Sequence, residues 1–281
     1  MAHEGDIALS VREGGRKAKW IWEIIAHNWR PATILAACVG LWWLVTAFGL
    51  VKPYLIPPPP AVWQALQTEW ALIARHTAIT LWETLAGFTI ALVLGEVVAV
   101  LVVMSPSLER SVYPIILFLQ IIPKIALAPL FVVWLGFGLA PKIVVAVLMA
   151  FFPVTISGVA GLRSVEPELL DLAATMGAGR WKTFYKIQFP ASLPHLFAGI
   201  KVAATMAVAG AVVGEFVGAN QGLGYLLLIA NGNLNAPLLF AGLLVMSVIG
   251  IGLFLAIEVT ERLLLPWHAS YRQQFTSTSL G

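Results

Sequence analysis

The chain has 281 residues, of which 59% are hydrophobic and only 11% are charged, and its mean hydropathy is +0.88. A soluble domain carries roughly a quarter charged residues, so this composition excludes a soluble protein and indicates an integral membrane protein. The net charge of +3 at pH 7 does not indicate a nucleic-acid-binding protein, because Lys and Arg in a membrane protein mainly report its orientation.

The chain begins with a polar and basic stretch, residues 1–31, in which Trp20 and Trp22 indicate an amphipathic approach to the membrane surface. We expect a cytoplasmic N-terminal segment and no cleavable signal peptide, because no A-x-A site closes the first apolar run. That run, residues 32–51, is predicted to be the first span, since about 20 apolar residues cover a hydrocarbon core of roughly 30 Å.

Four consecutive prolines, residues 57–60, are too stiff and too poor in N–H donors to be helical. Residues 61–76 follow them with apolar side chains at helical spacing. These side chains are Val62, Leu66, Trp70 and Ile73. We interpret this stretch as a helix that lies on the external membrane surface and does not cross it.

Five further apolar runs follow the first one. The six predicted spans are about 32–51, 81–104, 112–135, 143–160, 196–217 and 237–259. The sequence therefore predicts an all-α membrane protein with one transmembrane domain over residues 32–265. A loop over 163–195 and a tail over 266–281 complete the predicted organisation.

The distribution of Lys and Arg orients these spans. Most of the 17 basic residues fall on the side that holds both ends of the chain. Lys52, Arg75 and Lys142 fall on the other side, and Lys124 falls within a span. The positive-inside rule then places both termini and the 163–195 loop in the cytoplasm.

Several catalytic signatures are absent from the sequence. It contains no G-x-x-x-x-G-K-[ST] loop, so we expect no ATP site in this chain. The motifs H-E-x-x-H and G-x-S-x-G are also absent, and the five histidines are scattered, so we expect neither a metal site nor a catalytic centre. His195 and His268 lie near predicted helix ends, which favours ordinary interfacial hydrogen bonding. The single cysteine, Cys38, excludes an intrachain disulfide.

The 163–195 loop is the longest polar interval in the second half of the chain. Pro167 is a helix start signal, and Gly177 can adopt the left-handed conformation that ends such a helix. An apolar stripe at i, i+3, i+4 and i+7 lies between them. It consists of Leu169, Leu172, Ala173 and Met176. We expect this helix to contact a partner at the membrane surface.

A second short helix is predicted from Arg180 to Ile187. Pro190 and Pro194 then predict an interruption that lasts until the fifth span. The loop as a whole is therefore expected to be two short helices with a bend between them.

This loop resembles the cytoplasmic signature E-A-A-x-x-x-G-x9-I-x-L-P of permease subunits from binding-protein-dependent ABC importers. The chain has Asp171-Leu172-Ala173, three residues, Gly177, nine residues, and then Ile187-Gln188-Phe189-Pro190. The spacing matches throughout. The departures at Asp171, Leu172 and Phe189 keep acidic, apolar and apolar character.

The resemblance extends from about residue 32 to residue 268. Its further features are Thr80-Leu81, Gly87-Phe88, I-P-x-x-A-x-x-P-L over 122–130, Trp134-Leu135-Gly136, Gly214-Glu215, Gly222-Leu223-Gly224 and a terminal Pro-Trp-His. They are most similar to the branch that handles nitrate, sulfonates and taurine. Importers of riboflavin and thiamine precursors look similar as well.

The resemblance implies the type I ABC importer fold in a bacterial inner membrane, with two copies of the chain forming the pathway as a homodimer. Two cytoplasmic ATPase subunits would bind ATP and Mg²⁺, while this chain itself binds no cofactor. An external binding protein would deliver a small, anionic or organic solute. The remaining partner is membrane lipid, and nucleic acid is not a partner.

The resemblance also implies which residues contact the ATPase. They are Leu169, Asp171, Leu172, Ala173, Met176, Gly177, Arg180, Ile187 and Pro190. The alternative is a surface helix that packs only on its own bundle. We expect a Gly177→Leu variant to assemble in the membrane but to lose coupling to ATP hydrolysis.

Three charged residues lie within predicted spans, namely Glu96, Lys124 and Glu215. Each costs about 2.5–3.5 kcal/mol there unless it faces protein or water. The depths of Glu96 and Lys124 differ by only about 6 Å, so a structural ion pair between them, or a Lys124 that snorkels toward the membrane surface, is one interpretation. The other is a transport pathway in which Lys124, beside Gln120 and Pro123, attracts an anionic group. Glu215 is either a pathway or gate residue or a helix-packing one.

The alternative function is a self-sufficient channel or secondary transporter. A secondary carrier usually shows a two-fold internal repeat and coupling-ion residues near the midplane, and no such repeat is found in this sequence. Co-purification of an ATPase subunit would favour the importer, and uptake by the chain alone would overturn it.

Overall fold

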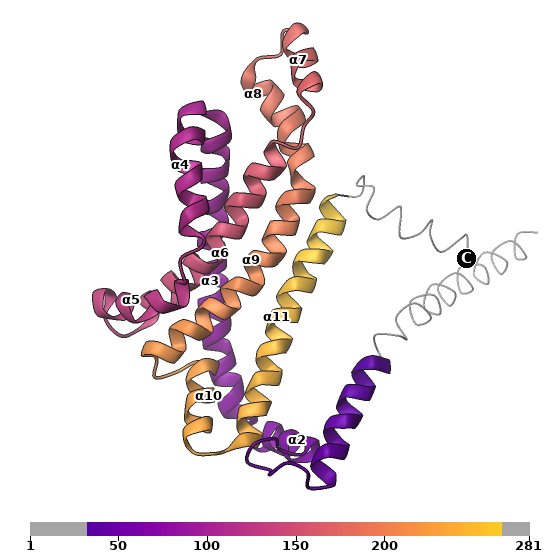
Figure 1. Ribbon diagram of the computed structural model, residues 1–281, viewed down its shortest axis with the longest axis vertical. Helices are drawn as coiled ribbons and strands as arrows, with labels where there is room; N and C mark the ends of the chain where they lie inside the picture. Colours follow the sequence, from indigo (N-terminus) through magenta and orange to yellow (C-terminus); the bar gives the residue numbers. More distant parts are fainter. Residues whose placement is uncertain (1–32, 266–281) are drawn as a thin grey trace, which may run out of the picture. The chain divides into compact units, whose positions relative to one another are not determined.

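The computed structural model describes residues 33–265, and all regular elements in this range are helices (Figure 1). The predicted N-terminal segment 1–31 and tail 266–281 lie outside the described residues. The same holds for Trp20, Trp22 and His268. The chain divides into two compact units, residues 1–64 and 65–281, which are described separately.

The first unit contains a helix from Thr33 to Ala47, which at 1.5 Å per residue is about 22 Å long. It is followed by a turn at Gly49, whose φ is +66°. Trp42 Nε1 donates a hydrogen bond of 3.0 Å to the carbonyl of Pro57. Residues 33–47 of the predicted span 32–51 are thus helical in the described part of the chain.

The described residues contain four helices long and apolar enough to cross a membrane, or five if a bent pair counts as one. The sixth span therefore stays a prediction.

The predicted external helix 61–76 divides at Glu69. α2 runs from Pro59 to Thr68, and α3 runs from Trp70 to Met104 as one helix of 35 residues. The predicted second span, 81–104, is thus the later part of a helix that begins at Trp70. The reason is local, because the backbone leaves the helical region at Glu69, with φ −100° and ψ 17°, and no proline follows before residue 106.

The predicted third span, 112–135, is not one helix. α4 runs from Pro106 to Leu119, a short 3-10 turn η1 from Lys124 to Leu127, and α5 from Ala128 to Leu135. The pair is bent by 85°. Pro123 lies at the break with ψ 89°, outside the helical range, and its missing N–H removes a helical hydrogen bond.

Seven further elements follow in the described part of the chain, of which α6, α9 and α11 are longer than the predicted spans 143–160, 196–217 and 237–259. The seven elements are α6 Leu139–Leu162, α7 Pro167–Thr175, α8 Arg180–Thr183, the π-helix η2 Phe184–Gln188, α9 Phe189–Gly218, α10 Leu223–Gly232 and α11 Ala236–Leu264. The prediction that Pro190 and Pro194 delay the fifth span is wrong, because α9 already begins at Phe189. Pro190 lies at the start of α9, directly after the π-helix, and Pro194 lies inside the helix.

Small residues bring α3, α6 and α9 into close contact. α6 packs against both α9 and α3. A Cβ atom on Gly87 of α3 would come within 2.5 Å of the Ala146 Cβ of α6, and one on Gly210 of α9 within 2.7 Å of the Ala146 Cα. Ala91, Ala150 and further small residues continue this packing. Helix contacts built from small residues are typical of membrane bundles.

The helix bundle has two distinct ends. α6 and α9 lie side by side, with α7 and α8 beyond one end and α10 at the other (Figure 1). Arg163 pairs with Glu109 of α4 at 2.5 Å at the first end, and Lys142 pairs with Glu83 of α3 at 2.5 Å at the second. The bent α4–α5 pair therefore connects one end to the other, which makes it a broken span and not a loop that returns to its own side.

Candidate functional site

Residues 163–195 form a two-helix projection at one end of the bundle (Figure 1). α7 begins with Pro167 and ends in a Schellman motif. In this motif the N–H of Ala178 donates to the carbonyl of Ala173 at 2.9 Å, and the N–H of Gly177 donates to Ala174 at 3.0 Å. Gly177 has φ +77°, the left-handed conformation that a glycine adopts without strain.

The apolar stripe of α7 faces outward. Leu169, Leu172 and Met176 are 47%, 58% and 79% exposed, whereas Ala173 is buried at 8%. Ala173 thus packs on its own chain, and the other three side chains form an exposed apolar surface, which we call the α7 face. No part of the described chain covers this face.

The second half of the projection differs from the predicted helix Arg180–Ile187. α8 has four residues and continues through the π-helix η2 directly into α9. Ile187 and Pro190 therefore lie in one continuous helical rod that connects the projection to the bundle. Asp171 and Arg180 are exposed on the projection.

A second group of polar residues lies at the opposite end of the bundle. We call it the polar cluster, and it consists of His76, Thr80 and Glu83 of α3, Lys142 of α6 and Glu215 of α9. All five side chains are buried, at 9% exposure or less. Lys142 Nζ donates to Glu83 Oε1 at 2.5 Å and to the carbonyl of Gln221 at 3.3 Å.

Glu215 accepts hydrogen bonds at both carboxylate oxygens. The Thr80 hydroxyl donates to its Oε1 at 2.6 Å, and the N–H of Gly224 donates to its Oε2 at 2.5 Å. The residue is fully buried, so in this conformation it does not line an open pathway.

The sequence analysis assigned Lys142 to the side opposite the 163–195 loop, where the polar cluster lies, but did not predict its burial. It gave no site role to His76, Thr80 and Glu83, and Thr80 appeared there only as part of the family resemblance. A signal was present, because these three polar residues recur at i, i+4 and i+7 within an otherwise apolar helix. Such spacing puts them on one helix face, where Lys142 and Glu215 meet them.

Glu96 and Lys124 do not form the ion pair that their depths allowed. Lys124 Nζ instead donates to the carbonyl of Gln120 at 2.6 Å and lies 4.6 Å from the centre of the Phe152 ring. Both carboxylate oxygens of Glu96 are shielded from solvent and have no hydrogen-bond partner among the described residues. The carboxylate lies against Gly158 of α6, where a Cβ atom would come within 3.0 Å of Oε2.

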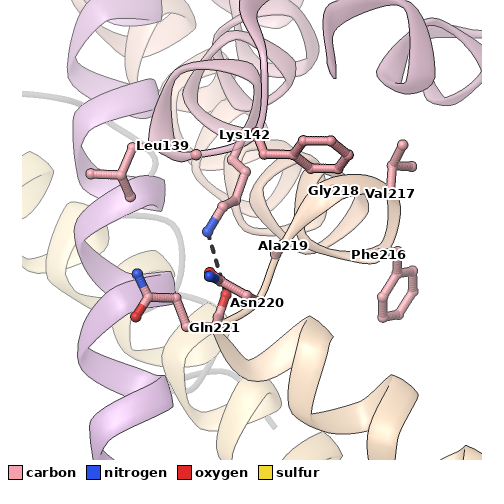
Figure 2. Close-up of a pocket in the computed structure, with 10 residues that line it drawn as sticks. Leu139, Lys142, Phe216, Val217, Gly218, Ala219, Asn220 and Gln221 are labelled. Carbon is pink, nitrogen blue, oxygen red and sulfur yellow. Dashed lines mark hydrogen bonds between the residues drawn. The ribbon is translucent and has the colours of Figure 1, made fainter. Parts of the chain in front are cut away.

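A cavity of about 490 Å³ adjoins the polar cluster (Figure 2). It is lined by Phe137, Gly138, Leu139, Lys142 and residues 216–221. Figure 2 shows the Lys142 side chain directed toward Gln221, which belongs to the loop between α9 and α10. Among the described residues, no group of three or more His, Cys, Asp or Glu is placed to hold a metal ion.

Comparison with known proteins identifies the family. Residues 87–266, well over half of the chain, match the family described as binding-protein-dependent transport system inner membrane component. The chain belongs to this family. It is therefore the membrane component of an ABC transport system, as its signature in the projection predicted, and the family is that of a transport component and not of an enzyme.

Relatives of this permease confirm the predicted branch. The chain is 38% identical over 226 residues to the formylaminopyrimidine transport permease protein ThiX of Halalkalibacterium halodurans, covering 80% of this chain and 90% of the relative. It is 29% identical over 269 residues to the taurine transport system permease protein TauC of Escherichia coli, covering 93% and 98%.

The fold of the permease is also known from a solved structure. The inward-facing MetNI methionine ABC transporter superposes with a TM-score of 0.62 at 23% identity, covering 69% of this chain and 97% of the other. This likeness confirms the predicted type I permease fold.

Proposed function

We propose that two copies of this chain form the translocation pathway of an importer and couple it to ATP hydrolysis. Two cytoplasmic ATPase subunits hold ATP and Mg²⁺ and bind the projection, and an extracytoplasmic binding protein supplies the solute at the opposite end. The complex lies in the bacterial inner membrane among its lipids, with both ends of each permease chain in the cytoplasm. The transmembrane domain then comprises residues 32–265.

The α7 face is the observation that carries this proposal. Leu169, Leu172 and Met176 are exposed on a helix that projects beyond the bundle, where polar residues rather than membrane-length apolar runs surround it. A contiguous apolar surface on a projecting helix favours docking into a groove of a partner. The alternative, packing on its own bundle, would have buried these three side chains.

The rest of the projection supports the same role. Ala173 anchors α7 to its own chain, Gly177 sets the bend, and Ile187 and Pro190 lie in the rod that leads into α9. Asp171 and Arg180 are exposed beside the α7 face and are available to a partner. Movement of the docked helix would thus reach the bundle through α8, η2 and α9.

Gly177 provides the test. Its φ of +77° costs any other residue roughly 1–2 kcal/mol, while the space where a Cβ atom would lie is empty. A Gly177→Leu variant should therefore insert and fold but tilt α7 away from its docking angle. We expect ATP hydrolysis by the reconstituted complex, and uptake, to fall while the amount of permease in the membrane is unchanged.

Gly179 is a matched control. A Cβ atom added to it would also meet nothing within 4 Å, but its φ is −67°, which every residue adopts. Gly179→Leu should keep both activities. Normal uptake by Gly177→Leu would show that the bend does not transmit force, and ATP-independent uptake by the wild-type chain alone would favour a self-sufficient transporter.

The solute is proposed to be a small organic molecule, because relatives of this chain are named for taurine, aliphatic sulfonates, riboflavin and formylaminopyrimidine. Lys124, with Gln120 and Pro123, lies at the break of the α4–α5 pair, where interrupted backbone in a membrane requires a lining of protein or a water-filled cavity. The Lys124 ammonium contacts only a backbone carbonyl and the Phe152 ring among the described residues, so its charge is available to an anionic group.

A Lys124→Met variant tests this pathway assignment. It keeps the length and apolar stem of the side chain but removes the charge, so uptake of a solute with an anionic group, such as the sulfonate of taurine, should fall while ATP hydrolysis without solute persists. Lys124→Arg is the control that keeps the charge. Unchanged uptake by Lys124→Met would remove Lys124 from the pathway, and Glu96 would need its own test as a pathway residue.

A further inference from the structure

The first turn of α10 is held by side chains from other helices. The first N–H groups of a helix have no partner within it and need acceptors from elsewhere. The backbone N–H of Gly222 donates to His76 Nδ1 at 2.9 Å. The N–H of Leu223 donates to the Thr80 hydroxyl at 2.7 Å, and that of Gly224 to Glu215 Oε2 at 2.5 Å. Three consecutive donors are thus satisfied from α3 and α9 and none by a local capping side chain.

The two glycines of this turn are required by Glu215. Gly222 has φ +113°, and a Cβ atom on it would overlap the Glu215 carboxyl group. On Gly224 a Cβ atom would lie 2.8 Å from Glu215 Oε2 and 2.9 Å from the carbonyl of Val212. The carboxylate therefore fills the space that both glycines leave, and the turn cannot shift without displacing it.

The loop that precedes α10 is held from its other side as well. Lys142 of α6 donates to the carbonyl of Gln221 while it pairs with Glu83 of α3. Because α10 also packs against α3, α9 and α11, the loop and this helix have few ways to move independently of the bundle.

Glu215 links the loop to the helix that begins at the projection. α9 starts at Phe189, directly after the π-helix of the projection, and ends at Gly218. Its 30 residues span about 45 Å at 1.5 Å per residue, so one helix runs from the end of the projection to the polar cluster.

We infer that Glu215 and Thr80 are positioning residues that make residues 219–224 and α10 move with α9, so that a signal passes between the outer end and the ATPase end of the permease. This inference rests on the proposed function and adds to it the residues that join the two ends. Both residues are fully buried, so this role does not require contact with the solute. Each acts by fixing α10 to the transmitting helix.

The experiment measures ATP hydrolysis by the complete complex in lipid nanodiscs, with and without its binding protein. The binding protein is purified together with its bound solute and added in that form. Thr80→Val replaces the hydroxyl by a methyl group of similar size, and Glu215→Gln replaces one acceptor oxygen by a donor. Both variants should lower the stimulation of ATP hydrolysis by the binding protein about tenfold, which is a typical size for coupling between sites. Hydrolysis without binding protein should be unchanged, because the projection is intact.

Two controls separate positioning from packing. Thr80→Ser keeps the hydroxyl and should restore stimulation. Thr84→Val removes another buried hydroxyl one turn along α3, which has no hydrogen-bond partner among the described residues, and should leave stimulation unchanged. Normal stimulation in both Thr80→Val and Glu215→Gln overturns the inference, as does an equal loss of hydrolysis with and without binding protein, which would indicate helix packing only. Lack of stimulation in the wild-type complex would instead count against the proposed function.

Discussion

At the residue scale, the most consequential buried charge is Lys142. Its side chain is 2% exposed and its partner Glu83 is fully buried, so neither charge is solvated by water. Attraction in such a site offsets the cost of desolvation only while both partners are present. Loss of either partner alone would therefore destabilise the packing of α3 against α6 at this end of the bundle.

This dependence gives a prediction about stability. Lys142→Met leaves the Glu83 carboxylate buried without its partner and should cost about 3–5 kcal/mol. The double variant Lys142→Met, Glu83→Met replaces both charges by apolar groups and should recover most of the loss. The thermal unfolding midpoint of the purified permease measures both effects. Equal midpoints for the single and double variants would show that the two residues are not energetically linked.

The same residues show what could be predicted from the sequence at this scale. Glu215 was identified because a carboxylate inside an apolar run is unusual. Lys142 was assigned to the correct end of the bundle, but its burial was not predicted, because a charge near the end of an apolar run is normally taken for a loop residue. The absence of a Glu96–Lys124 pair depends on the broken backbone at Pro123, which directs Lys124 toward Phe152. The depths of the two residues in the membrane, which are all that the sequence provides, could not predict which way the Lys124 side chain points.

At the element scale, the apolar runs predicted α6, α9 and α11 because the membrane sets a minimum length for each helix. They did not predict helix ends, since hydrogen bonding continues beyond the apolar core until a proline or a non-helical residue stops it. α3 therefore begins at Trp70, far outside its apolar run, and the predicted external helix ends at Thr68.

The projection was predicted with unequal success. The apolar stripe and the position of Gly177 directly after it predicted both α7 and the bend that ends it. This succeeded because the positive φ at Gly177 is a local property of the backbone. The π-helix over Phe184–Gln188 was not predicted, since its composition does not differ from that of an α-helix. The inward position of Ala173 likewise depends on packing against the rest of the chain.

At the scale of the whole molecule, the number of crossings decides the orientation of the chain. α3, the broken α4–α5 pair, α6, α9 and α11 make five passes between the two ends of the bundle. An odd number places the start of α3 and the end of α11 on opposite sides. Both ends of the chain can then be cytoplasmic only if the Thr33–Ala47 region makes a sixth crossing.

Single cysteines can test this arrangement, since Cys38 is the one native cysteine and can be replaced by serine. We expect a membrane-impermeant maleimide to label an Asn233→Cys variant only from the external side, because Asn233 is exposed at the α10 end. Lys182→Cys, on the projection, and Ser10→Cys should react only in inverted vesicles. Labelling of Ser10→Cys from the external side would limit the chain to five crossings and would show that the predicted first span is wrong.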